Sequence, residues 1–351
     1  MKTGLSKLFL ASLFSIALLT ACGGGGGSTP TSPVVPPVTT VPLVSVYQAA
    51  NLVAIAPSPS YSAGSEELAA YNHFNGARVN CGFGALTQKS AVDTAAINHS
   101  NWVITNGKVS HVETTGSPGF TGINPSDRGV FAGYGKIDTF QFSEVISARF
   151  YVEKTGYGVR MAKNLLNAPY HLNAMMRGYR DVGTAIAVVK APVSSRDWTV
   201  LAFNLGNTNV AGPQSLASDE VGTYPCEGTT GVNIGATTEL PSPVPGRDMD
   251  SNPIGLSFYV GVRDGNTIAV TSAVVTNLST GNPEKIGNVL TRKTDPNGQS
   301  GNTYFESNQA VVFTDKPASP NTKYSVVING TNNDKPFTRN FAFTTGTGGL
   351  E

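Results

Sequence analysis

Histidine is the side chain best suited to moving protons or binding metal ions near neutral pH, and this chain of 351 residues contains four of them. They are His73, His99, His111 and His171. The whole stretch after residue 171 contains none. We therefore expect any acid–base or metal chemistry to lie in the first half of the chain.

The sequence lacks the usual signatures of covalent catalysis. It has no Gly-x-Ser-x-Gly turn, no Ser-x-x-Lys pair and no Cys-x-x-Cys motif. The glycine run at 23–27 does not follow an expected strand and continues into Ser, Thr and Pro, which is typical of a tether and not of a phosphate loop. These features favour a binding or structural role over an enzyme with its own nucleophile.

The N-terminus has the pattern of an export signal. Lys2 and Lys7 precede an apolar run at 8–19, which is too short to span a bilayer and is followed by small residues. The ending Leu19-Thr20-Ala21-Cys22 resembles a lipobox, in which the cysteine receives acyl chains such as palmitate and anchors the protein to a membrane. The alternative is an ordinary secretory signal with an unrelated cysteine.

The expected location is therefore the bacterial cell envelope. Gly23 after the cysteine resembles lipoproteins that are released to the outer membrane or cell surface. Cleavage removes Lys2 and Lys7 from 24 basic residues and leaves 23 acidic ones, so the mature chain is nearly neutral. Since the sequence has no basic run, nucleic acid is not an expected partner.

The remaining cysteines, Cys81 and Cys226, form an even pair in a chain that we expect to be exported to an oxidising compartment. We predict a disulfide between them. It would close a loop of about 145 residues, which the chain-entropy model rates at several kcal/mol of stability. The alternative is two separate free thiols.

Helices dominate the beginning of the folded part. Ser65 is placed to cap a helix that carries Glu66 and Glu67 in its first turn. An apolar stripe at helical spacing predicts a second helix that ends at Asn106-Gly107. The stripe consists of Val92, Ala95, Ala96, His99, Trp102 and Val103. Because His99 lies on this stripe, we expect it in the core and not in a site.

The next region changes from helix to strand. Residues 114–135 are rich in Gly, Pro and Ser and are expected to form a loop, whereas 143–152, 159–166 and a short stretch near His171 look helical. Runs of Val, Ala, Ile and aromatic residues at 181–190 and 198–205 predict two strands. Helices followed by strands indicate an α+β arrangement.

The last hundred residues are predicted to be all β. Four prolines between 241 and 253 indicate a linker, and short alternating strands separated by turn residues follow it, as in a β-sandwich. The expected organisation is a signal peptide at 1–21, a Gly/Pro/Ser/Thr tether at 22–45, a first domain at 46–235, a Pro-rich linker at 236–253 and a β-sandwich domain at 254–351.

Between residues 66 and 207 a series of motifs resembles the CAP superfamily, also called SCP-like (cysteine-rich secretory proteins, antigen 5 and pathogenesis-related proteins). The order and spacing of the motifs carry this resemblance more than any single one does. They are Asn75-Gly-Ala-Arg78, Gly84-Ala-Leu86, Ala95-Ala-Ile-Asn-His99, Ser110-His111, Arg128 with Ala132-Gly133-Tyr134, Ser143-Glu144-Val145-Ile146, Pro169-Tyr-His171-Leu-Asn-Ala-Met-Met176, Val182-Gly183 and the strand at Trp198.

The resemblance implies an α-β-α sandwich with an open cleft lined by two His and two Glu, which bind a divalent metal in some members. His111, Glu144 and His171 match these positions, and no residue matches the second Glu. We hold Glu113 and, after it, Glu153 as reserve candidates for the missing carboxylate. The family's Gly and Asn around its glutamate, and its Arg after the second His, are replaced in this sequence.

Three roles for the matched residues stay open. They can hydrogen-bond to one another and hold loops, form a cleft for a lipid, sterol-like or glycan ligand, or hold a divalent metal such as zinc for hydrolysis. The C-terminal part resembles immunoglobulin-like modules of bacterial surface proteins. We expect an extracellular binding lipoprotein, with a metal-dependent hydrolase and a structural or adhesive protein with an inert cleft as the alternatives.

Overall fold

The computed structural model describes residues 47–350 with gaps at 154, 191–195, 299–303 and 349. The predicted signal peptide at 1–21, the predicted lipidation site Cys22 and the tether at 22–45 lie outside the described residues. The segment Val46–Glu351 forms one compact unit. None of the helices in the described part is long and apolar enough to cross a membrane.

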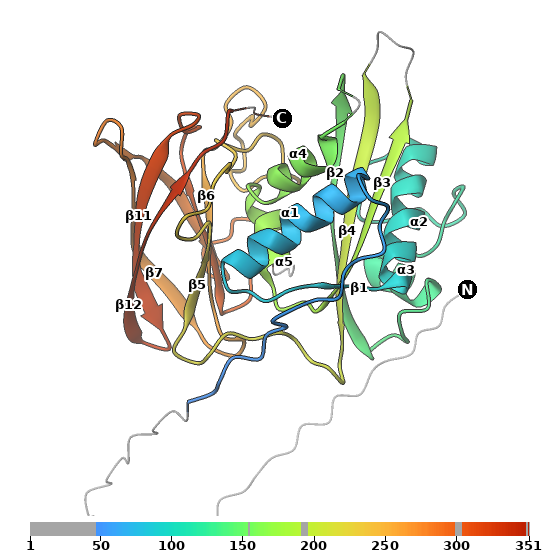
Figure 1. Cartoon of the computed structure of the whole chain (residues 1–351), viewed down its shortest axis with the longest axis horizontal. Helices are drawn as coiled ribbons and strands as arrows, with labels where there is room; N and C mark the ends of the chain where they lie inside the picture. The colour runs from blue at the N-terminus through green and yellow to red at the C-terminus, as the bar shows by residue number, and fades with distance from the viewer. Residues whose placement is uncertain (1–46, 154, 191–195, 299–303, 349, 351) are drawn as a thin grey trace, which may run out of the picture. The chain divides into compact units, whose positions relative to one another are not determined.

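Both helices and sheets are present, so the predicted α+β class is confirmed (Figure 1). The first sheet has the strand order β1-β3-β4-β2, with β1 parallel to β3 and the other pairs antiparallel. Its strands are β1 (Thr87–Gln88), β2 (Phe140–Tyr151), β3 (Asp181–Val189) and β4 (Asp197–Thr208). Strand β2 is therefore an outer strand of this sheet.

Helices cover both faces of the first sheet (Figure 1). Along β4, Leu201, Phe203 and Leu205 join the core beneath one helical layer, while Val200 and Ala202 pack toward the other. Successive side chains of a strand point to opposite faces, so burial on both faces requires a layer on each side. The helices are α1 (Glu66–Asn80), α4 (Tyr157–Leu165) and α5 (Pro169–Met176) on one side, and α2 (Ser90–Asn106) and α3 (Pro125–Phe131) on the other.

The caps of the first two helices are as the sequence predicts. The Ser65 hydroxyl accepts the N–H of Leu68 at 3.1 Å, and Gly107 ends α2 in the left-handed conformation at φ 63°. A left-handed residue at this place strongly favours glycine, which has no Cβ to clash. The helix expected at 159–166 and the strands expected at 181–190 and 198–205 are confirmed as α4, β3 and β4.

Two local predictions are wrong. The stretch at 143–152 is not a helix but most of β2, which pairs with β4 along its whole length. Its Val145 and Ile146 are buried on opposite faces, and this two-sided burial hides the period of two by which strands are normally recognised. The expected loop at 114–135 contains α3, which starts at Pro125 and whose Asp127 accepts the N–H of Asn124 at 2.9 Å.

The C-terminal part consists of two four-stranded sheets with a shared core. One sheet has the order β5-β6-β10-β9 and the other β12-β11-β7-β8. Apolar side chains such as Phe258, Tyr324 and Phe343 fill the space between them. The strands are β5 (Val221–Tyr224), β6 (Ser257–Val262), β7 (Ile268–Asn277), β8 (Pro283–Glu284), β9 (Ile286–Thr291), β10 (Gln309–Thr314), β11 (Lys323–Asn332) and β12 (Lys335–Thr344).

The helical part and the two-sheet part pack directly against each other. A single core cluster contains Met175 of α5 together with Tyr259 of β6 and Phe313 of β10. Strand β5 lies before residue 236 in the sequence but pairs with β6. Within the stretch expected as a linker, Ala236 and Met249 are buried in the same cluster. This stretch is therefore positioned firmly enough to supply side chains to a site.

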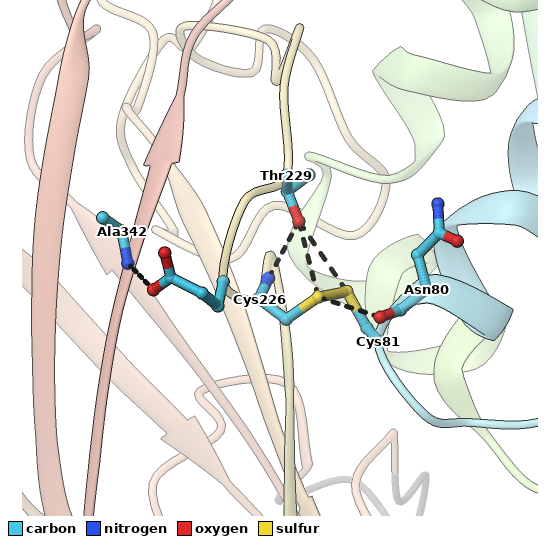
Figure 2. Close-up of a disulfide and its surroundings, with 6 residues drawn as sticks. Asn80, Cys81, Cys226, Thr229 and Ala342 are labelled. Atoms are coloured by element: carbon cyan, nitrogen blue, oxygen red, sulfur yellow. Dashed lines mark hydrogen bonds between the residues drawn. A yellow bond between two sulfur atoms is a disulfide. The ribbon is translucent and has the colours of Figure 1, made fainter.

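The predicted disulfide between Cys81 and Cys226 is present (Figure 2). Cys81 caps the C-terminus of α1, and Cys226 follows β5, so the bond ties the helical part to the two-sheet part. The two Cα atoms are 5.5 Å apart, which is within the usual range for a disulfide. The hydroxyl of Thr229 accepts the N–H of Cys226 at 3.1 Å and fixes the loop beside the bond.

Candidate functional site

His111 and Glu144 form the first half of the candidate site. The Nδ1 atom of His111 lies 3.0 Å from Oε1 of Glu144, which stands on β2. Arg128 of α3 donates to the other oxygen of Glu144 at 2.8 Å. Burial by itself raises the pKa of the Glu144 carboxyl, but the hydrogen bond from His111 and the charge of Arg128 outweigh it and leave the pKa below its ordinary value.

His171 forms the second half with a carboxylate that the sequence reasoning missed. Its Nδ1 atom lies 2.6 Å from Oε1 of Glu239, and the same oxygen accepts the backbone N–H groups of Tyr170 and His171 at 3.0 and 2.9 Å. These N–H groups belong to the first turn of α5, where an anion is favoured by the helix dipole. Glu239 therefore caps α5 and orients His171 at once.

The two halves meet around the free edge of β2. The ring centroids of His111 and His171 are 6.3 Å apart, so the structure brings His111, Glu144 and His171 together as expected. The His111 side chain is 41% exposed and that of His171 is 15% exposed, whereas both carboxylates are fully buried. Each imidazole is thus held by a buried acceptor and presents its other side toward accessible space.

The other candidates have different positions. His99 is buried on α2 as predicted, stacks on Trp102 and lies 2.9 Å from Oε1 of Glu113. Its Nε2 atom is also 3.3 Å from Oε1 of Glu144, so His99 contacts the site from its buried side. Glu113 also accepts the N–H of Thr121 at 2.7 Å, so it holds the loop after α2 and does not supply the missing carboxylate. Glu153 is exposed and pairs with an arginine. His73 lines a different cavity, and burial lowers its pKa to about 4, so its ring is neutral near pH 7.

A cavity of about 300 Å³ opens beside the two histidines. It is bounded by β2, by α4 and the start of α5, and by residues 235–240. Its wall is largely apolar by area, and its polar side chains include His111, His171, Glu239 and Arg149. The apolar side chains are Val109, Ile146, Ala148, Leu165, Ala168, Ala236 and Leu240.

The expected zinc ligand set does not fit this arrangement. Both oxygens of Glu144 already accept hydrogen bonds, one from His111 and one from Arg128, and a cation at this carboxylate would meet the guanidinium. Across the described ranges, no three His, Cys, Asp or Glu side chains are grouped so that they could hold a metal ion. We therefore derive no chemical step through a metal at His111, Glu144 and His171.

The location of Glu239 explains why it was missed. It lies 68 residues after His171 in the Pro-rich stretch, and no spacing rule connects the two positions.

Comparison of the chain with models of known protein families gives no match, and comparison with curated proteins gives none either. The interpretation of the site consequently depends on its geometry and on the motifs in the sequence.

Proposed function

We propose that this chain is a lipoprotein of the bacterial cell envelope, anchored through Cys22, with a CAP domain that binds a ligand. The order of the CAP-like motifs, the sheet with helices on both faces, and the pairing of His111 with Glu144 support this assignment. Glu239 takes the role of the second carboxylate in the proposal. We further propose that the two-sheet part is an immunoglobulin-like module that positions this domain.

The observation that carries the proposed binding function is the cavity beside the histidines. Its volume of about 300 Å³ is at the lower end of the range for small-molecule sites. Most of its wall is apolar by area and includes seven aliphatic side chains, and burial of a matching apolar ligand contributes roughly 25 cal/mol per Å² removed from water. This wall favours a lipid or sterol-like ligand over a glycan fragment, whose hydroxyl groups need many polar partners.

A fluorescent apolar probe tests the proposal. N-phenyl-1-naphthylamine should bind to residues 46–351 with an increase in emission, and medium-chain lipids should displace it. Ser147→Phe on β2 and Thr237→Phe in the segment 235–240 each place an aromatic ring in the cavity and should abolish the signal. Ser272→Phe, at an exposed position on β7, is the matched control and should leave it intact. Equal binding by all four proteins would refute the proposal.

A further inference from the structure

The two carboxylate oxygens of Glu239 differ in their hydrogen bonding within the described residues. Oε1 accepts three N–H groups, two from the backbone of α5 and one from the ring of His171. Oε2 has no hydrogen-bond partner among the described residues, although the side chain is fully buried. A buried carboxylate oxygen without a partner costs free energy that a suitable donor would recover.

Glu239 lines the cavity, so a ligand bound in the cavity could supply the missing hydrogen-bond donor. We propose that the ligand of this cavity carries a hydroxyl group that donates its hydrogen to Oε2 of Glu239, with an apolar body along the aliphatic wall. This inference rests on the proposed binding function and adds the chemistry of the ligand's polar end. A carboxylate acts only as an acceptor when ionised, so the oxygen selects a donor.

The charged side chains around the cavity further limit the chemical class of the ligand's polar group. A fatty-acid anion would place a second negative charge against the fully buried carboxylate of Glu239, and like charges repel strongly at close range where the surroundings are poorly solvated. An alkylammonium ion is disfavoured because Arg149 lines the same cavity. A neutral hydroxyl avoids both repulsions. His171, whose ring orientation is fixed by Glu239, lines the same cavity.

Three ligands with the same chain separate these chemistries: 1-decanol, its methyl ether and decanoate. The ether keeps the oxygen but lacks the donated hydrogen. We expect 1-decanol to bind to residues 46–351, a compact unit with its own cores, about tenfold to a hundredfold more tightly than the ether, as measured by displacement of N-phenyl-1-naphthylamine. Decanoate should bind more weakly than 1-decanol.

The variant Glu239→Gln makes the test specific. Three N–H donors hold the amide oxygen at the position of Oε1, so the amide NH₂ replaces Oε2 and turns the acceptor into a donor. The preference for 1-decanol over the ether should then be lost, and decanoate should gain affinity. Glu153→Gln, the same substitution at an exposed position, should change nothing.

The outcomes distinguish the inference from the proposed function. If the fluorescent probe does not bind to the wild-type protein, the proposed binding function fails. If the probe binds but 1-decanol and its ether displace it equally well, or Glu239→Gln keeps the wild-type order, the proposed role of Glu239 is wrong while the cavity remains a binding site. Circular dichroism of each variant confirms that it is folded before the affinities are compared.

Discussion

Arg128 is the residue whose removal should disturb the candidate site most clearly. Its guanidinium is fully buried, donates to Glu144 at 2.8 Å and to the carbonyl of His111 at 3.1 and 3.2 Å, and so fixes both partners of the first histidine pair. The substitution Arg128→Leu keeps an apolar stem but leaves Glu144 as a buried negative charge with less compensation. Removal of one partner of a buried ion pair costs about 3–5 kcal/mol.

The pH dependence should change together with the stability. In the wild type the pKa of Glu144 is lowered, so its contribution to stability is present above the unfolded-state pKa and is lost as the pH falls through the folded-state value. In Arg128→Leu, only His111 and His99 still oppose the effect of burial, so the pKa of Glu144 is higher than in the wild type. Protonation then relieves the buried charge, and the difference between variant and wild type should shrink in acid.

Urea denaturation of residues 46–351 at pH 7 and at pH 4 measures both effects. The expected loss is about 3–5 kcal/mol at pH 7 and clearly less at pH 4. Arg292→Leu, which breaks an exposed pair with Glu306, should stay within about 0.5 kcal/mol at either pH. A loss below about 1 kcal/mol for Arg128→Leu, or a loss that does not depend on pH, would contradict the reasoning.

Two further changes test how the elements are held together. Joint replacement of Cys81 and Cys226 by Ser should lower the free energy of unfolding by about 2–5 kcal/mol, and a change below 1 kcal/mol in urea would argue against a constraining bond. Gly183→Ala places a methyl group against the backbone of Val92 in α2 and should cost about 1–3 kcal/mol. Its control, Gly76→Ala in α1, meets no neighbour and should gain roughly 0.5–1 kcal/mol, so an equal loss in both would refute the close approach.

Local chemistry was enough to predict several parts of the fold. Ser65 caps α1, Gly107 ends α2, and His99 is buried because it lies on the apolar stripe of its helix. The disulfide between Cys81 and Cys226 followed from counting cysteines in an exported chain. Each of these features is determined by neighbouring residues or by an even number of thiols, and tertiary packing was not needed to predict it.

The features that the sequence did not reveal depend on packing between distant segments. Strand β2 is buried on both faces, so its apolar residues show neither a clear helical nor a clear strand period. Glu239 reaches His171 only because residues 236–253 pack against α5 and do not span open solvent. The cavity lies at the edge of β2, where segments from both faces of the sheet come together. Because these segments are distant in the sequence, no local sequence pattern predicts the cavity.

The most direct test of the central claim is a crystal structure of residues 46–351 grown with 1-decanol. The account predicts electron density for the alkyl chain along the aliphatic wall of the cavity, with the hydroxyl oxygen about 2.7 Å from Oε2 of Glu239. The ring of His171 should keep its hydrogen bond to Oε1. A cavity that stays free of decanol at saturating concentration, or decanol bound at another place, would contradict the proposal that this cavity is a binding site.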